Sequence, residues 1–332
     1  KNAAQTLNAV SDGGAKLLYL GGMALREDAL EQAGRIAAAT GARLVCETFP
    51  ARLQRGAGRV AVERLPYFGE MASDFLKDFT QVVLVGTKPP VSFFAYPGKP
   101  SWLMPEAATL TTLATPREDA LDALTRLAQA LDAPAQPSKV QSPAAMPAEP
   151  GQLNPVNLGA IVGELMPENA VVADESNTAG LVIFPMTQGA PQHDWLTLTG
   201  GSIGFGLPLA TGAAIACPDR KTICLQADGS AMYTVQALWT MARENLDITT
   251  VILNNGSYAI LNIELSRVGV AQPGPKALSL LDLTNPPINW VPVSEGMGVP
   301  AVRVDTAEAF RDAFKDALAH KGPRLIEAMI VQ

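Results

Sequence analysis

Two short polar clusters contain the side chains of this sequence that are best suited to chemistry. The first, Asp-Gly-Ser, occupies residues 228–230, and the second, Asn-Asn-Gly-Ser, occupies residues 254–257. A carboxylate from Asp228, an amide oxygen and a backbone carbonyl would form a set of hard oxygen ligands, which suits Mg2+. Gly229 would let the backbone approach a phosphate, and Ser230 would add a hydroxyl near the start of a helix, where N–H groups favour anions.

The segments around these clusters predict how they are brought together. Residues 222–226 and 249–253 are apolar, partly β-branched runs that predict buried strands. Between them, the apolar residues recur at i, i+3, i+4 and i+7, which predicts one helical face: Val235, Leu238, Trp239 and Ala242. The two strands of such a βαβ unit are parallel, so both clusters should lie at their carboxyl ends, about 5 Å apart if the strands are neighbours.

That edge of an open α/β sheet is where ligands bind. Taken singly, each cluster is also typical of an ordinary turn, since Asp-Gly-Ser can cap a helix and Asn-Asn-Gly can reverse the chain. The two clusters together favour a metal–diphosphate site.

Length and composition favour an enzyme with two domains. The chain has 332 residues, 48% of them hydrophobic and 17% charged, with a formal net charge of -7. This charge disfavours a nucleic-acid partner, and no apolar run reaches the roughly 18 residues that a membrane helix needs. We therefore expect a cytoplasmic protein without a membrane partner.

The cysteines and histidines exclude two further kinds of site. Cys46, Cys217 and Cys224 are odd in number and far apart, so we expect free, buried thiols in a reducing cytosol. Only two histidines occur, which excludes a His-rich metal site. We expect His193 on the surface.

Alternating strand-like and helix-like segments predict an α/β fold with two Rossmann-like domains, whose parallel sheets are covered by helices. We expect a central Rossmann-like domain at 1–132 and a cofactor-binding domain at 156–332. Residues 133–155 are rich in Pro, Ala, Ser and Gln and predict an interdomain linker. The other predicted strands are 17–20, 43–46, 81–86, 109–114, 170–173 and 324–330, and the other predicted helices are 26–40, 118–131, 157–165 and 307–319.

The motif Ala227-Asp228-Gly229 followed by Asn254-Asn255 resembles the signature of thiamine-diphosphate enzymes that act on 2-oxo acids. That signature is Gly-Asp-Gly, a spacer of a little under thirty residues, and Asn-Asn. The flanking sequence is most similar to the benzoylformate decarboxylase branch, and it is also similar to the central region of acetolactate synthase. One residue departs from it, because Ala227 stands at the first glycine. A methyl group is tolerable there if φ is negative and the diphosphate passes Gly229 instead.

The resemblance implies thiamine diphosphate and Mg2+ as cofactors. It assigns Mg2+ to Asp228, Asn255 and the backbone carbonyl of Ser257. Gly229 and Ser230 would contact the diphosphate.

Two further segments match positions that hold the cofactor in the family. Asn177 and Thr178 would hold the diphosphate, although a capping turn would explain them equally. Gly201 would offer its carbonyl to the aminopyrimidine, and Ile203 would be the apolar wedge that bends the cofactor. A closely packed, Gly-rich start of a helix is the alternative for this second segment.

The implied activity is decarboxylation or carboligation of a 2-oxo acid. In the family, the catalytic Glu lies in an N-terminal pyrimidine-binding domain of a neighbouring subunit, and the resemblance here begins at the central domain. No catalytic residue is therefore assigned. The start at Lys1 favours a fragment of a longer polypeptide, and a separate subunit is the alternative. We expect the complete enzyme to be a homo-oligomer, at least a dimer, and the isolated chain to be inactive.

The substrate stays open. Tyr233, Tyr258, Ile260 and Leu261 would line the mouth of the pocket or belong to the core, and residues 93–95 lack the His that benzoylformate decarboxylase carries after the corresponding strand.

The first domain has no GxGxxG motif after its first strand, so we do not expect bound FAD. A non-catalytic thiamine-diphosphate-binding module is the alternative function. A nucleotide-binding oxidoreductase is disfavoured for the same lack of a dinucleotide motif.

Overall fold

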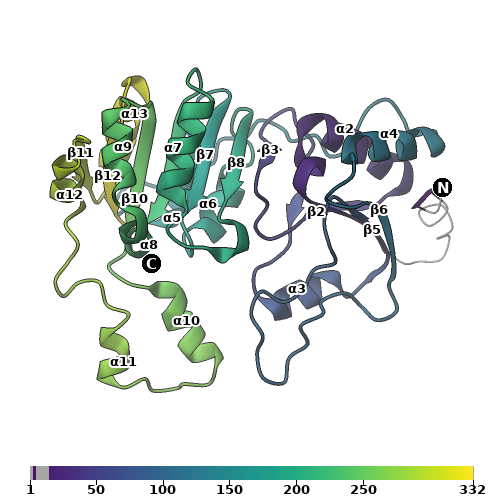
Figure 1. The fold of residues 1–332 in the computed structure, drawn as a ribbon, viewed down its shortest axis with the longest axis horizontal. Coiled ribbons are helices and arrows are strands. Elements are labelled where there is room, and N and C mark those ends of the chain that lie inside the picture. The colour runs from purple at the N-terminus through teal and green to yellow at the C-terminus, as the bar shows by residue number, and fades with distance from the viewer. Residues whose placement is uncertain (1–2, 5–14, 332) are drawn as a thin grey trace. The chain divides into compact units, whose positions relative to one another are not determined.

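A computed structural model describes residues 3–4 and 15–331 (Figure 1). The chain divides into two compact units, Lys1–Ser142 and Pro143–Gln332, and the division falls inside the predicted linker. Lys1, on which the expectation of a fragment was based, lies outside the described residues. None of the described helices is long and apolar enough to cross a membrane.

The first unit is built on a parallel sheet with the strand order β4-β2-β1-β5-β6. Its strands are β1 (Ala15–Leu20), β2 (Arg43–Cys46), β4 (Glu63–Arg64), β5 (Phe79–Val85) and β6 (Thr109–Ala114), and β3 (Leu53–Arg55) lies outside this sheet. Its helices are η1 (Gly22–Leu25), α2 (Glu27–Thr40), α3 (Gly69–Leu76) and α4 (Ala120–Ala130). Helices α2 and α4 lie on one face of the sheet and α3 on the other (Figure 1).

The second unit carries a larger parallel sheet, in which its strands follow the order β11-β12-β10-β9-β7-β8. The strands are β7 (Ala170–Glu175), β8 (His193–Thr197), β9 (Thr222–Ala227), β10 (Ile248–Asn254), β11 (Ala301–Val304) and β12 (Arg324–Met329). The central strand β10 is buried throughout, as expected for a parallel sheet covered on both faces.

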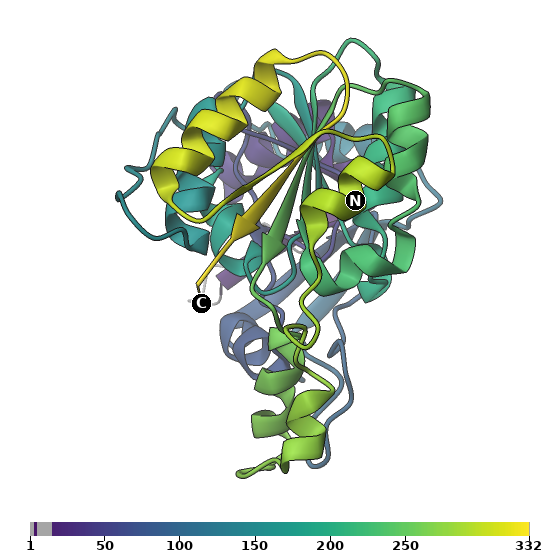
Figure 2. The same ribbon diagram turned by 90° about the vertical axis from the view of Figure 1, so that its left-hand side faces the viewer.

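Helices cover both faces of this sheet (Figure 2). They are α5 (Pro155–Leu165), α6 (Gly180–Met186), η2 (Thr199–Gly201), α7 (Gly206–Ala216), α8 (Asp228–Ala231), η3 (Met232–Thr234), α9 (Ala237–Arg243), α12 (Trp290–Gly296) and α13 (Ala307–Ala319). The predicted α/β fold class, with parallel sheets covered by helices, is therefore confirmed. The buried side chains of α7 and α9 form one core with β9 and β10, which includes Leu207, Leu238 and Ile252.

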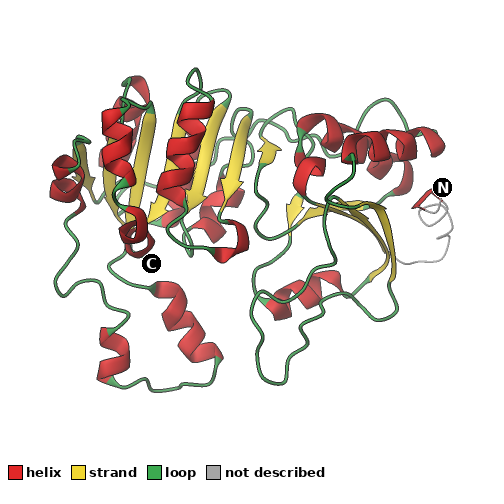
Figure 3. Ribbon diagram, in the orientation of Figure 1, coloured by secondary structure: helices red, strands yellow, loops and turns green. Residues whose placement is uncertain are grey.

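A helical arm extends from the carboxyl edge of this sheet (Figure 3). It contains α10 (Ala259–Arg267) and α11 (Pro275–Ser279). At its base, the N–H of Tyr258 donates to the carbonyl of Leu281 at 2.9 Å, and the N–H of Leu283 donates to the carbonyl of Gly256 at 2.8 Å. The two ends of the arm are thus joined to each other beside the second polar cluster.

The predicted linker contains no helix or long strand, but it is held by hydrogen bonds. The N–H of Ser138 donates to the carbonyl of Gly34 in the first unit, and the N–H of Ala144 donates to the carbonyl of Gly189 in the second. The segment ends at Asn154, whose side chain caps α5 in a reciprocal capping box.

One predicted helix is wrong in its form. The segment that follows β9 is divided into α8, η3 and α9 instead of forming one continuous helix. Leu238 is buried as predicted, whereas Trp239 is 52% exposed. Val235 and Ala242 pack against the same core as Leu238, so only Trp239 of the predicted face does not belong to it.

Candidate functional site

The candidate residues come together at the carboxyl edge of the second sheet. From β7 the chain continues outward to β8, and it then returns to the other side of β7 to form β9. The loops that follow β7 and β9 therefore leave in opposite directions from neighbouring strands. Such a topological switch point is where open α/β sheets bind ligands. Figure 3 shows the strand arrows of this unit ending on the side from which the α10–α11 arm extends.

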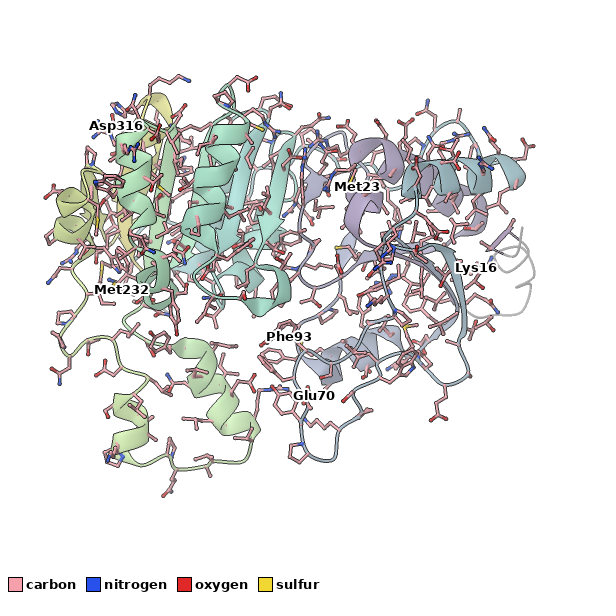
Figure 4. The ribbon with its side chains drawn as sticks, viewed as in Figure 1. Lys16, Met23, Glu70, Phe93, Met232 and Asp316 are labelled. Carbon is pink, nitrogen blue, oxygen red and sulfur yellow. The ribbon has the colours of Figure 1, made fainter. Side chains whose placement is uncertain are left out.

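Both polar clusters lie at this edge, as predicted. Strands β9 and β10 are parallel neighbours, and Ala227 is in register with Leu253. Asp228 follows directly after β9 and Asn254 is the last residue of β10, so the two clusters begin side by side. In Figure 4, Met232 marks the short helices after β9, and Asp316 on α13 lies at the opposite end of the sheet.

Asp228 is a buried carboxylate, with a side chain only 3% exposed. Its Oδ1 accepts from the N–H of Gly229 at 2.9 Å, and its Oδ2 accepts from the N–H of Gly256 at 2.9 Å. The second bond joins the two clusters directly. Burial raises the pKa of Asp228 to about 6, although these backbone N–H groups act in the opposite direction. A buried carboxylate of this kind is suited to a cation.

The second cluster is a tight turn with a glycine at its centre. Gly256 has φ of 66°, a left-handed conformation that favours glycine. The Oδ1 atoms of Asn254 and Asn255 accept from the N–H groups two residues ahead, at 3.0 Å in both cases. The predicted metal ligands Asn255 and Ser257 thus belong to a turn that is hydrogen-bonded to Asp228 through Gly256.

The space beside Gly229 is used by the protein itself. A Cβ atom built at this position would lie 2.4 Å from Cε1 of Tyr258 and 3.0 Å from Cδ1 of Leu283. Glycine is therefore required for Tyr258 to pack here. The pKa of Tyr258 is raised, first by burial and then by the charges of Tyr233 and Asp228, which shows that these groups are neighbours.

The hydroxyl of Ser230 faces the interior of the unit. It accepts from Nε2 of Gln226 at 2.7 Å and donates to the carbonyl of Ala227 at 3.3 Å. The role predicted for Ser230 at the diphosphate would therefore fall to its backbone N–H instead of its hydroxyl.

A buried carboxylate that the sequence analysis missed holds the glycine segment. Glu175, the last residue of β7, is fully buried. Its Oε1 accepts from the N–H of Gly204 at 2.6 Å, and its Oε2 accepts from the N–H of Gly206. A Cβ at Gly206 would lie 3.0 Å from Cβ of Glu175 and 2.2 Å from Oε1 of Gln226. An acidic residue at the end of a strand, directly before the predicted Asn177-Thr178 turn, was the available signal.

The glycine segment also contacts the loop that follows β9. A Cβ at Gly204 would lie 2.6 Å from Cβ of Tyr233, and the hydroxyl of Thr234 donates to the carbonyl of Gly204 at 2.8 Å. Gly201 has a positive φ of 65° in the turn before this contact, and the side chain of Ile203 is 43% exposed. An exposed large apolar side chain between two glycines is compatible with the predicted wedge.

Asn177 and Thr178 lie in the turn after β7, at the switch point. Both are half-buried, and Asn177 has a positive φ of 51°. The carbonyl of Asn177 accepts from the N–H of Gly180 at the start of α6. The two residues form a turn, although neither side chain caps α6, and because β7 and β9 are neighbouring parallel strands this turn begins beside the loop of Asp228.

His193 is not on the surface, so that expectation was wrong. It is the first residue of β8, it is fully buried, and its Nδ1 lies 2.7 Å from the carbonyl oxygen of Pro191. As the first residue of a parallel strand, it lies at the amino end and not at the candidate site. Cys46 and Cys224 are buried free thiols as expected, and Cys217 is free and partly exposed.

The residues present fit Mg2+ and a diphosphate. Among the described residues, no group of three or more His, Cys, Asp or Glu side chains could hold a metal. The available donors are therefore the single carboxylate of Asp228 and the neutral oxygens of the turn at 254–257, which leave ligand positions for phosphate and water. Ala227 has φ of −72°, so its methyl group is accommodated without strain.

Side chains lie close to the switch point of the first unit, between β1 and β5. A Cβ at Gly21 would lie 2.7 Å from Cβ of Thr87 and 3.1 Å from Oε1 of Glu47. The pKa of Glu47 is raised by burial, while hydrogen bonds from Gly22 and Thr87 act to lower it. The side chains of this unit thus fill the place next to Gly21.

Comparisons with known proteins show what the chain is similar to. Residues 180–328 match the family model described as thiamine pyrophosphate enzyme, C-terminal TPP binding domain. The chain is 53% identical over 315 residues to a Mycobacterium tuberculosis protein whose provisional name is acetolactate synthase large subunit IlvX, and this match covers 95% of the chain and 61% of that protein. It is 32% identical over 192 residues to benzoylformate decarboxylase of Pseudomonas aeruginosa, which covers 58% of the chain and 35% of that enzyme.

A solved structure extends the likeness to the fold. The thiamine diphosphate-dependent 4-hydroxybenzoylformate decarboxylase of Rhodococcus jostii RHA1 superposes with a TM-score of 0.78 at 26% identity, over 99% of this chain and 63% of that one. The chain thus spans about three fifths of the length of these relatives at most. Residues 180–328 are thus similar to the C-terminal TPP binding domain of thiamine pyrophosphate enzymes, and the chain is similar in sequence to an acetolactate synthase-like protein and to benzoylformate decarboxylase.

Proposed function

We propose that the chain supplies the Mg2+- and diphosphate-binding half of a thiamine-diphosphate-dependent decarboxylase or carboligase that acts on 2-oxo acids. The observation that carries the proposal is the junction of Asp228 with the turn at 254–257 through the N–H of Gly256. It places one buried carboxylate among neutral oxygen donors at the switch point of the sheet.

Each loop at this edge would have a separate task. Asp228, Asn255 and the carbonyl of Ser257 would bind Mg2+, while the loop with Asn177 and Thr178 would lie along the diphosphate. When bound, the cofactor supplies the reactive carbon and the electron sink for loss of CO2. The residues of this chain would bind, orient and shield that cofactor.

The glycine segment would carry the aminopyrimidine side of the site. Glu175 fixes the N–H groups of Gly204 and Gly206, and this anchoring would set the position of Gly201 and Ile203 relative to the cofactor. Tyr233 lies next to Gly204 of this segment and Tyr258 lies next to Gly229, which follows Asp228, so both would form part of the wall of the substrate pocket.

The complete site would need a partner. The family resemblance assigns the catalytic Glu to an N-terminal pyrimidine-binding domain of the same or another chain, in a homo-oligomer of at least two subunits. We therefore expect the 332 residues alone to bind the cofactor weakly and to turn over a 2-oxo acid at the background rate. The three free thiols are compatible with the expected cytoplasmic location.

Isothermal titration calorimetry tests the proposal, with thiamine diphosphate as the titrant in the presence of Mg2+ or of a chelator. We expect binding that requires Mg2+ and is lost in Asp228→Ala. Inorganic diphosphate with Mg2+ should compete, because it would occupy the diphosphate-binding part of the proposed half-site.

Asp316→Ala is the matched control. It removes an exposed carboxylate of the same unit, on α13 at the opposite end of the sheet (Figure 4). This variant should bind like the wild type. Equal binding with and without Mg2+, or equal binding by Asp228→Ala, would contradict the proposed function.

A further inference from the structure

A second buried carboxylate lies behind the metal-binding turn. Glu327, in the middle of β12, is fully buried. Its Oε1 accepts from Nδ2 of Asn254 at 2.8 Å. Its Oε2 accepts from Nε of Arg303 at 2.8 Å, and Nη2 of the same arginine lies 3.2 Å from Oε1. The ion pair compensates the cost of burying this charge, because an unpaired carboxylate would not be tolerated in the interior.

Register explains why these side chains meet. Glu327 is the partner of Ile252 on β10 and of Arg303 on β11. Asn254 lies two residues after Ile252, so its side chain is on the same face of the sheet as that of Glu327. The pairing is thus built into the three strands and does not depend on a loop.

The carboxylate determines which way the amide of Asn254 points. An ionised carboxylate can only accept hydrogen bonds, so Nδ2 of Asn254 must face Glu327. Oδ1 is then directed to the N–H of Gly256, which it accepts at 3.0 Å. The same N–H also donates to Oδ2 of Asp228 at 2.9 Å. A line of hydrogen bonds therefore runs from Arg303 to Asp228.

We infer that Glu327 is a positioning residue for the Mg2+–diphosphate site. It acts through Asn254 to hold the turn that carries Asn255 and Ser257 in the geometry that a cation requires. The inference rests on the proposed function, since it assigns a role in the same site. Side chains that do not touch the metal but hold its ligands by hydrogen bonds typically contribute about 10–100-fold to metal affinity.

Glu327→Gln tests the inference with almost no change of volume. The glutamine has one accepting oxygen and one donating nitrogen, so it cannot accept from both Asn254 and Nε of Arg303. If its oxygen faces the arginine, the amide of Asn254 must reverse and can no longer accept from Gly256. We expect the Mg2+ concentration that half-saturates thiamine diphosphate binding to rise by about 10-fold or more.

The readout separates positioning from stability. Binding is measured by calorimetry at 15 °C, and unfolding is measured by thermal melting of the same samples. Asp194→Asn is the matched control, because Asp194 is also buried and paired with an arginine, Arg220, at 2.7 Å. Asp194 is the second residue of β8, near the amino end of the strands. This variant should lower the melting temperature and leave the Mg2+ dependence unchanged.

The outcomes are distinguishable. A wild-type protein without Mg2+-dependent binding would refute the proposed function itself. A wild-type protein that binds, together with a Glu327→Gln variant of unchanged Mg2+ dependence, would overturn only the present inference. If Glu327→Gln does not fold, Arg303→Met replaces it, with Arg220→Met as its control. Arg303→Met should shift the half-saturating Mg2+ concentration by about 10-fold, the low end of the same range, and an unchanged value would equally overturn the inference.

Discussion

Asp228 makes the metal-free protein sensitive to pH in an unusual direction. Its pKa is about 6 in the folded protein, compared with an ordinary value of 3.8. The folded state therefore binds this proton more tightly than the unfolded state. Its contribution to stability is largest below pH 3.8 and falls as the pH rises towards 6. Taking about 1.4 kcal/mol per pH unit, the two pKa values correspond to a loss of about 3 kcal/mol.

Replacing Asp228 with Ala isolates this contribution. Other carboxyl groups shift too, since hydrogen bonds lower the pKa values of Glu118, Glu164 and Asp282. Burial raises the pKa of Glu47. Their effect is common to both proteins and cancels in the difference. The free energy of unfolding of the wild type minus that of Asp228→Ala should therefore decrease by roughly 2.5 kcal/mol between pH 4 and pH 7.5, since the remainder is already lost below pH 4.

Urea unfolding in the presence of a chelator, repeated across this pH range, measures the difference. Tryptophan fluorescence suits the assay because Trp195, Trp239 and Trp290 all belong to the second unit. A difference that is independent of pH, or that grows with pH, would refute the reasoning that burial dominates at Asp228. Addition of Mg2+ and diphosphate at pH 7.5 should restore wild-type stability and leave the variant unchanged.

Three substitutions test neighbouring parts of the site. Glu175→Gln leaves the N–H of either Gly204 or Gly206 without an acceptor. It should lower the free energy of unfolding by about 1–3 kcal/mol in urea unfolding. An unchanged stability would refute the anchoring role. Gly229→Ala places a methyl group 2.4 Å from the ring of Tyr258. It should lower the free energy of unfolding by about 1–3 kcal/mol in the same assay. An unchanged stability would show that the ring moves freely. Ala227→Gly restores the glycine of the family motif. It should leave the affinity for thiamine diphosphate in calorimetry unchanged, because Ala227 already has a φ of −72° that any residue can adopt. Tighter binding would show that the methyl group obstructs the cofactor.

The sequence predicted the parts of the fold that depend on local pattern. The strands at 43–46 and 109–114 and the helix at 307–319 have the bounds that were expected. The neighbourhood of Asp228 and the Asn-Asn turn was also predicted, because a βαβ unit restricts how its two strands can pair. The segment after β9 was harder, since a periodic pattern does not reveal where a helix is interrupted.

The contacts that support the site were not predictable in the same way. Glu175 meets Gly204 and Gly206 only because β7, β8 and the start of α7 are brought together by the sheet order. Glu327 meets Asn254 through the register of β10 and β12, and Trp195 on β8 donates to Asp174 on β7. Each of these contacts joins distant segments, and a single sequence gives no measure of strand order or register.

The joined base of the helical arm has a consequence for how this fold can diversify. Backbone hydrogen bonds connect residues 256–258 with 281–283, so the chain between them forms a loop that is closed at its base. The length and sequence of residues 268–275 can then change without moving residues 254–258. The arm is thus a region whose length and sequence can vary without changing the backbone at residues 254–258.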